Sequence, residues 1–162
     1  MVEAVSGSEH QRVNDLWQAQ SLAGHGFDVN NVFAQSFKNT SLLHIAAAGR
    51  SHEVVERLLS HGAAVNCLNG AGQSPLHCAA TPDIARILVR CGADVNLMNP
   101  VIGWTAVSYA MEKAMVSQEW REWTIELLAE HDADVEAAVQ MLELWSFLYD
   151  EEFLQELHKY ID

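Results

Sequence analysis

Residues 74–96 read SPLHCAATPDIARILVRCGADVN, and the last five belong to a string that recurs through the chain. GADVN at 92–96 is preceded by GFDVN at 26–30 and GAAVN at 62–66, and a degraded copy, DADVE, follows at 132–136. The intervals are 36, 30 and 40 residues. Self-similarity at such intervals is the signature of a repeat architecture, in which each unit is one small supersecondary element.

The first seven residues of the same stretch also recur. SPLHCAA at 74–80 matches SLLHIAA at 41–47, and TAVSYAM at 105–111 is a third copy that has lost the histidine. The serine or threonine that opens each copy can accept a hydrogen bond from the next turn, as an N-cap does. In the middle copy, Pro75 then falls at the first helical position, where its missing N–H costs nothing. Each copy therefore predicts the start of a short, alanine-rich helix.

A second helix follows the first in each unit. Apolar residues recur at helical spacing at 54–59 and 84–88, and Gly62 and Gly92 stand where a residue with positive φ ends a helix. Because a unit of this size cannot bury its apolar stripe alone, the units must stack. We expect six residues to be buried between helix layers: Leu58, Leu59, Leu76, Ile87, Leu88 and Leu127.

SPLHCAA, followed by a leucine-rich helix and GADVN, resembles the ankyrin-repeat pattern T-P-L-H-x-A-A, with about 33 residues per repeat. The resemblance is strong over residues 41–96 and weaker as far as 136. It implies an all-α, ankyrin-type α-solenoid of stacked helix-turn-helix repeats with short β-hairpin-like fingers. We expect a single domain over 1–162: an N-terminal cap or half repeat (1–30), two repeats (31–66, 67–96), a divergent repeat with an insertion (97–136) and a C-terminal helical cap (137–162).

The sequence departs from the pattern in five places, two of which are the longer loops at 30–40 and 96–104. Thr-Pro at 81–82 directly follows the middle SPLHCAA string and shortens the turn between its two helices. An insertion at 112–118 lengthens the helices of the third repeat. Asp132 replaces the terminating glycine, which predicts that the last helix pair ends differently.

The two ends of the chain have the pattern of caps. Residues 11–23 form one amphipathic segment, and 137–161 form two that are broken near Asp150. The apolar faces of the C-terminal pair are expected to comprise Leu142, Trp145, Leu148 and Tyr149, then Phe153, Leu154, Leu157 and Ile161. Capping the stack is the expected role, and a partner-binding amphipathic tail is the alternative.

The histidines and cysteines fit structural roles better than catalytic or metal-binding ones. His44 and His77 share a repeat position, and the resemblance implies that this histidine ties neighbouring turns together. The segment HEVVE at 52–56 differs from the HExxH zinc motif at its second histidine. The three cysteines form no CxxC pair and lie in or beside apolar runs, as small hydrophobes. We therefore expect no catalytic residue, no metal site and no cofactor.

Charge limits the possible partners. Nine Lys+Arg against 22 Asp+Glu give −13, and residues 112–162 alone hold 14 acidic and three basic side chains, or −11. This balance argues against binding to a phosphate backbone. The acidic end either keeps the molecule soluble or attracts a basic partner. With no signal-peptide pattern and no apolar run of about 18 residues, we expect a cytoplasmic protein that is monomeric by itself and binds neither nucleic acid nor membrane.

Apolar side chains stand in two loops, 30–40 and 96–104, where turn chemistry normally favours polar residues. They are either anchors for a partner or residues that pack on their own repeat, and for Trp104 both interpretations stay open. The resemblance adds the finger tips and the exposed positions of each first helix as contacts. The candidate partner-binding residues are Phe33, Phe37, Leu68, Ala71, Gln73, Met98, Val101, Trp104, Glu112, Lys113, Glu119 and Glu122.

These observations indicate a non-catalytic protein-interaction module that binds another protein through its concave or finger face. The alternative is an acidic stoichiometric inhibitor or immunity-type protein that blocks a basic enzyme, and an enzyme is the remote third. Ionic strength separates the first two, because electrostatically steered association slows as salt rises.

Overall fold

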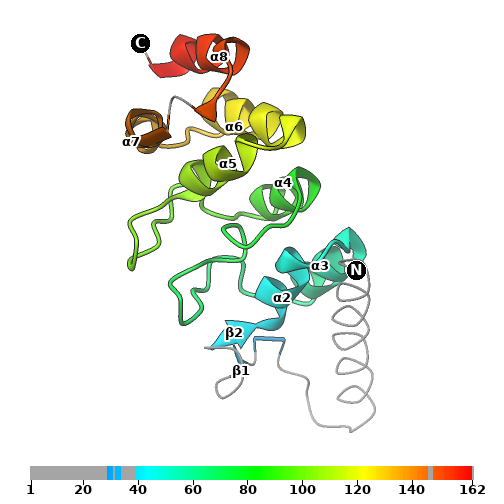
Figure 1. Cartoon of the computed structure of the whole chain (residues 1–162). Coiled ribbons are helices and arrows are strands. Elements are labelled where there is room, and N and C mark those ends of the chain that lie inside the picture. The colour runs from blue at the N-terminus through cyan, green and yellow to red at the C-terminus, as the bar shows by residue number, and fades with distance from the viewer. Residues whose placement is uncertain (1–28, 31, 34–38, 146–147, 162) are drawn as a thin grey trace, which may run out of the picture. The chain divides into compact units, whose positions relative to one another are not determined.

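The computed structural model (Figure 1) describes residues 29–30, 32–33, 39–145 and 148–161, in two compact units, 1–93 and 94–162. Apart from two-residue strands, the described secondary structure is helical, which confirms the expected all-α repeat class. The N-terminal segment expected to form a cap helix, 11–23, lies outside the described residues. None of the described helices is both long and apolar enough to cross a membrane.

The described part of the first unit contains a two-stranded hairpin and three helices. Strand β1 (Val32–Phe33) pairs antiparallel with β2 (Thr40–Ser41), so that Val32 lies opposite Ser41 and Phe33 opposite Thr40. Helix α3 packs against both α2 and α4. The helices are α2 (Leu42–Ala48), α3 (His52–Ser60) and α4 (Pro82–Arg90).

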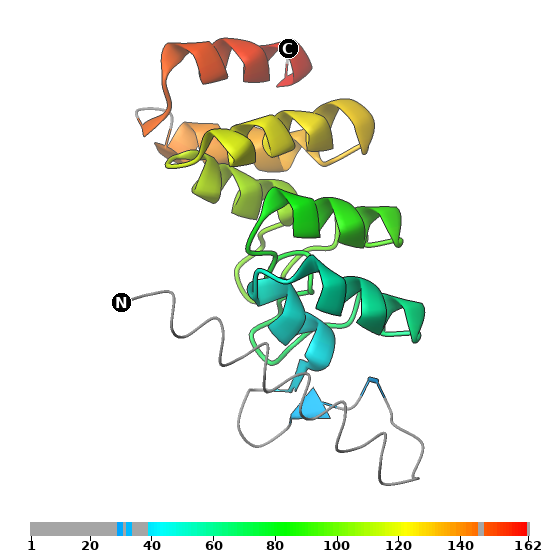
Figure 2. The same cartoon turned by 90° about the vertical axis from the view of Figure 1, so that its right-hand side faces the viewer.

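The described part of the second unit contains four helices. Helix α5 packs against α6 and α7, and α8 packs against α6 and α7; Figure 2 shows α8 (red) alongside α6 (yellow). The helices are α5 (Ala106–Ala114), α6 (Gln118–Glu130), α7 (Val135–Trp145) and α8 (Glu151–Ile161). Helix α6 has 13 residues where α3 and α4 have nine, as the insertion at 112–118 predicts.

The first repeat begins on a reciprocal cap between Ser41 and His44. The Ser41 hydroxyl accepts a hydrogen bond from the His44 N–H at 3.4 Å, and His44 Nδ1 accepts one from the Ser41 N–H at 3.3 Å. On its other side, His44 Nε2 donates to the Gln73 carbonyl at 2.9 Å. His44 is 1% exposed and joins two consecutive repeats, which is the structural role expected for it.

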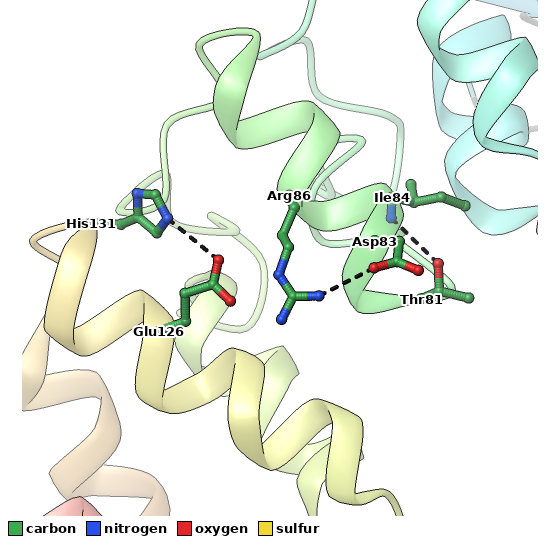
Figure 3. A network of polar contacts seen from close by, with 6 residues as sticks. All are labelled: Thr81, Asp83, Ile84, Arg86, Glu126 and His131. Atoms are coloured by element: carbon green, nitrogen blue, oxygen red, sulfur yellow. Dashed lines mark hydrogen bonds and ion pairs between the residues drawn. The ribbon is translucent and has the colours of Figure 1, made fainter.

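The prediction of a helix after Ser74 is wrong. Residues 75–78 form a single turn, in which the Cys78 N–H donates to the Ser74 carbonyl at 3.2 Å. The reason lies in the next helix, because the Thr81 hydroxyl accepts from the Ile84 N–H at 3.3 Å (Figure 3). Pro82 occupies the first position of that helix, α4. With α4 fixed there, too little chain remains after Ser74 for more than one turn.

The capping bond predicted for Thr105 is also wrong. Thr105 precedes α5 at the expected position, yet its buried hydroxyl has no hydrogen-bond partner among the described residues. In the first repeat the cap is reciprocal because a histidine stands three residues later. Here that position is Ser108, so the reciprocal bond of the first repeat has no counterpart. The hydroxyl bond itself needs no histidine, because the Thr81 hydroxyl accepts from the Ile84 N–H without one.

The three helix ends marked by the recurring string each place one residue in the left-handed region. Gly62 and Gly92 have φ of 84° and 91°, and Asp132 adopts a left-handed φ of 49°. Aspartate is among the few non-glycine residues that tolerate this region, because its short polar side chain can hydrogen-bond locally. The hydrogen bonds at the last end differ: the N–H groups of Ala63 and Ala93 donate to carbonyls five residues earlier, at 3.1 and 3.0 Å, whereas the Ala133 N–H donates to the Leu127 carbonyl, six residues earlier, at 3.3 Å. The last helix pair therefore ends differently, as expected.

The asparagine that closes each string joins one repeat to the next. Asn30 Nδ2 donates to the Gly62 carbonyl at 3.2 Å, and its Oδ1 accepts from the Ala64 N–H at 2.7 Å. Asn96 makes the same pair of bonds to the Asp132 carbonyl and the Asp134 N–H, at 2.9 and 2.8 Å. The recurrence of asparagine therefore has a mechanical cause, which the sequence analysis did not identify.

Five of the six predicted core residues are buried: Leu58, Leu76, Ile87, Leu88 and Leu127. Leu59 is only half-buried, so its assignment to the core is wrong. It lies at the rim of the α3–α4 contact and lines an open hollow there together with Ile87 and Arg90.

The C-terminal segment covers the apolar faces of α6 and α7. Phe153 and Leu157 are buried, whereas Leu148, expected on an apolar face, is 47% exposed because it follows the end of α7. The hydroxyl of Tyr149 donates to the Met111 carbonyl at 3.0 Å, and burial, aided by Glu112, raises the pKa of Tyr149 to about 12. The connection into α8 is thereby fixed to α5.

Leu88→Ala tests the packing of the first unit. Leu88 is 0% exposed, so the substitution should lower the free energy of unfolding by about 2–5 kcal/mol, through lost transfer energy and a residual cavity. The matched control is Leu68→Ala, where the leucine is 40% exposed and the loss should stay below about 1 kcal/mol. Chemical denaturation of both variants measures the difference, and equal losses would contradict the packing described.

Acid should weaken the His44 joint. Burial lowers the pKa of His44 from 6.5, against the raising effect of its hydrogen bonds to Gln73 and Cys67. Below pH 6.5 the unfolded chain therefore binds a proton that the folded chain rejects, and the free energy of unfolding should fall by up to about 1.4 kcal/mol per pH unit. The stability that depends on neutral His44 is fully present above pH 6.5, and it is lost as the pH falls toward the pKa of His44 in the folded protein.

Urea melts between pH 7.5 and 5 measure this effect. His44→Gln should reduce the pH dependence, whereas His52→Gln, at an exposed histidine of α3, should retain it. Identical pH dependence in the two variants would refute the assignment to His44.

Candidate partner-binding surface

The loop at residues 97–104, called here the second-unit finger, is closed by two backbone hydrogen bonds. The Asn99 N–H donates to the Trp104 carbonyl at 2.8 Å, and the Gly103 N–H donates to the Asn99 carbonyl at 2.8 Å. Gly103 has a φ of 77°, which glycine adopts without strain. These bonds make a tight hairpin-like turn that leads directly into α5.

The Asn99 side chain fixes the finger from inside. It is 1% exposed; its Oδ1 accepts from the Val101 N–H at 2.9 Å, and its Nδ2 donates to the Tyr109 hydroxyl at 3.0 Å. The turn is therefore fastened to α5 through a buried polar link. Sequence reasoning missed Asn99, although Asn69 stands 30 residues earlier and organises its own finger in the same way.

The tip of this finger exposes apolar side chains. Val101 is 69%, Met98 55% and Ile102 51% exposed. Met98 and Val101 were expected at the surface, and Ile102 joins them. A rigid turn with three neighbouring exposed apolar side chains is a typical anchor for a protein partner.

Trp104 lies at the base of the finger. Its ring packs edge-to-face on Tyr109, with centroids 5.3 Å apart, and the residue is half-buried. This contact favours the interpretation in which the indole packs on its own repeat. Trp104 and Asn99 thus converge on Tyr109, and together they support the tip.

The finger of the first unit, residues 67–73, is built alike but presents less apolar surface. Asn69 Oδ1 accepts from the N–H groups of Ala71 and Gln73, at 2.9 and 3.0 Å. Leu68 is 40% exposed, whereas Ala71 and Gln73 are half-buried. The Gln73 carbonyl also accepts the bond from His44 Nε2, so its backbone has a structural role.

Two candidates precede this finger. The backbone of Phe33 belongs to strand β1, opposite Thr40. Phe37 lies outside the described residues.

The charged candidates lie on α5 and α6. Glu112, Glu119 and Glu122 are exposed. Lys113 is half-buried, with its ammonium 4.2 Å from the centre of the Trp120 ring, which holds the side chain against α6. Residues 94–162 contain 15 Asp+Glu and three Lys+Arg, so the second unit carries 3 − 15 = −12.

The close-up in Figure 3 shows two contacts between ionisable side chains, one in each unit. In the first unit, Arg86 contacts Asp83 at 3.2 Å, one turn apart on α4. In the second unit, Glu126 lies 3.9 Å from His131 at the end of α6. Each pair joins side chains near in sequence, and the Asp83–Arg86 pair has the i,i+3 spacing that supports a single helix.

Within the described part of the chain, one group could supply three ligands to a metal. Glu126, Glu130 and His131 have ligand atoms within 4.8 Å of one another. All three come from one helix end, and Glu130 is exposed. The HEVVE segment, 52–56, forms no such group among the described residues.

A second cluster superficially resembles a nucleophile with its base. Ser41 Oγ lies 2.7 Å from His44 Nδ1, and Cys67 Sγ lies 3.6 Å from Ser41 Oγ. However, Ser41 is only 3% exposed and its hydroxyl caps α2. The cluster therefore serves the repeat joint.

Comparison with known proteins identifies the family. A sequence profile described as ankyrin repeats (3 copies) matches residues 10–99. The nuclear factor NF-kappa-B p105 subunit of Gallus gallus is 33% identical over 103 residues, which are 60% of this chain and 10% of the relative. The chain thus spans about a tenth of the length of that relative. With the recurring strings, the asparagine joints and the profile match in agreement, the chain belongs to the ankyrin-repeat family.

Proposed function

We propose that this chain is a non-catalytic interaction module that holds a partner protein on the tip of the second-unit finger. The observation that carries the proposal is the exposure of Met98, Val101 and Ile102 on a turn fastened by the buried Asn99. A pre-organised turn loses little conformational entropy on binding, so its apolar contacts contribute more of their energy to affinity. Membership of a family of protein-binding modules supports the same conclusion.

The acidic side chains define the kind of partner. The second unit carries −12, and Glu112, Glu119 and Glu122 are exposed on the helices that follow the finger. Such a field attracts a basic protein and raises its association rate. The preferred partner is therefore a protein with a basic surface around an apolar pocket.

Inhibition of a basic enzyme is the second candidate function. The same charge excess favours it, because a stoichiometric blocker gains specificity and speed from electrostatic complementarity. In either case, the finger supplies the short-range contact and the charge supplies the long-range attraction.

Substitutions at the finger tip test the proposed site. Val101→Ser with Ile102→Ser should weaken partner binding at least about tenfold, because both side chains would lose apolar burial in the complex. The matched control is Val116→Ser, since Val116 is 90% exposed in the same unit but outside the finger. The three baits are the unchanged protein, the finger double variant and the Val116→Ser control. The unchanged protein captures the partner from a lysate, and the affinity of that partner for each bait is then measured.

All three baits should melt at the same temperature, because the substituted side chains are exposed. Binding that survives in the finger variant would place the partner on another surface and reject the proposal.

Salt dependence separates the two functions. For an inhibitor steered by charge, the association rate should fall at least about tenfold between 0.05 and 0.5 M salt. For an adaptor anchored mainly by the finger, the rate should change less and the dissociation rate should dominate the affinity. Stopped-flow or surface-based kinetics with the captured partner decides between them.

A further inference from the structure

A groove of about 380 Å³ runs between α6 and α8 in the second unit. Ile125 of α6 and Phe153 of α8 supply its apolar part, and Glu122 and Glu152 line it from the two helices. The groove therefore lies on other elements than the finger, which leads into α5. We call it the α6–α8 groove.

Arg121 is the one cation among the described residues that line the groove, and it is already engaged. Arg121 forms an ion pair with Asp150, and its Nε donates to the Ala114 carbonyl at 2.9 Å. Asp150 Oδ1 in turn accepts from the Phe153 N–H at 2.9 Å, which caps α8. Arg121 is therefore held in place and neutralises Asp150 rather than the remaining carboxylates.

The remaining carboxylates leave the groove negative. Glu156 pairs with Lys159, whereas Glu122 and Glu152 are exposed and have no cationic partner among the described residues. Like charges that line one concave surface raise the local concentration of cations. The groove is thus short of positive charge by about two units at its rim.

The groove also offers contacts that a simple ion would not use. The half-buried Ile125 presents aliphatic surface. The Arg121 guanidinium lies 5.6 Å from the centre of the Phe153 ring, which shows a guanidinium against an aromatic face in this groove. An arginine side chain combines an apolar stem with a planar cation and matches both features.

We propose that the α6–α8 groove binds a basic segment of a partner protein, with one arginine of the segment between Glu122 and Glu152 and an adjacent apolar side chain on Ile125. The inference does not rest on the finger, because the groove lies on different helices. A partner could contact this groove alone or together with the finger.

Isoleucine methyl groups allow both surfaces to be observed in one sample. The chain has six isoleucines, of which Ile125 lies in the groove and Ile102 on the finger tip. The probe is a synthetic hexapeptide of alternating leucine and arginine, blocked at both ends, titrated into methyl-labelled protein at about 0.15 M salt. The Ile125 signal should shift saturably while the Ile102 signal stays in place.

Charge-matched variants separate a specific site from general attraction. Glu122→Gln with Glu152→Gln should weaken peptide binding about fivefold, as expected for two partly exposed ion pairs. The control, Glu136→Gln with Glu143→Gln, removes the same charge from exposed positions of α7 and should change affinity less than about twofold. A peptide in which citrulline replaces arginine, uncharged but nearly the same shape, should not bind.

Three results would overturn the inference. The first is an unchanged Ile125 signal, or a shift at Ile102 in its place. The second is an equal loss of affinity in both charge variants, which would mean attraction by net charge alone. The third is equal binding of the citrulline peptide. None of these results bears on the finger variants, so the two proposals fail independently.

Discussion

The structure depends on one repeated constraint: the loop of each repeat must hold the turn of the next repeat at a fixed distance from its own repeat. Units of two short helices cannot bury their apolar stripes alone, so the register between neighbours determines whether a core exists. A side-chain amide meets this need because it donates and accepts at once. Asn30 and Asn96 each bind a carbonyl and an N–H of the following turn, at 2.7–3.2 Å. The left-handed residue at that turn, Gly62 or Asp132, provides the carbonyl.

The finger follows from the same constraint. Because Asn96 fixes the start of the loop and Thr105 precedes α5, residues 97–104 must leave and return within a short distance. Asn99 closes that excursion and binds Tyr109 from inside. The apolar tip is then held away from the repeat core, where Val101 cannot fold back without breaking its bond to Asn99 Oδ1. A loop that is rigid for structural reasons can thus display apolar side chains to a partner.

Much of the fold could be predicted from the sequence, because the repeat strings, the helical periodicity and the terminating glycines are local signals. The errors occurred where a residue's role depends on partners elsewhere. Ser74 does cap the turn that follows it, because its hydroxyl accepts from the His77 N–H at 3.4 Å, but Pro82 fixes the next helix and leaves room for one turn only. Thr105 looks like a cap in sequence, but its buried hydroxyl has no hydrogen-bond partner among the described residues. At the site, Trp104 and Val101 are both apolar loop residues in sequence. Only the position of Tyr109 distinguishes the packed indole from the exposed tip. The α6–α8 groove was equally invisible, since it needs two helices about 30 residues apart to lie side by side.

Charge and apolar contact act over different distances, and the second unit separates them in space. The second unit has a net charge of −12, and at physiological salt the electric field of these charges extends over roughly 8 Å. This field governs how often a basic partner arrives. Apolar burial begins only at contact and governs how long the partner stays. Carboxylates placed at the finger tip would oppose this division, because burying them would cost desolvation energy. The acidic residues instead occupy exposed helix faces and the groove rim, where they keep their water in the free protein. In the proposed complexes, selection for basic partners and the lifetime of binding can therefore change independently.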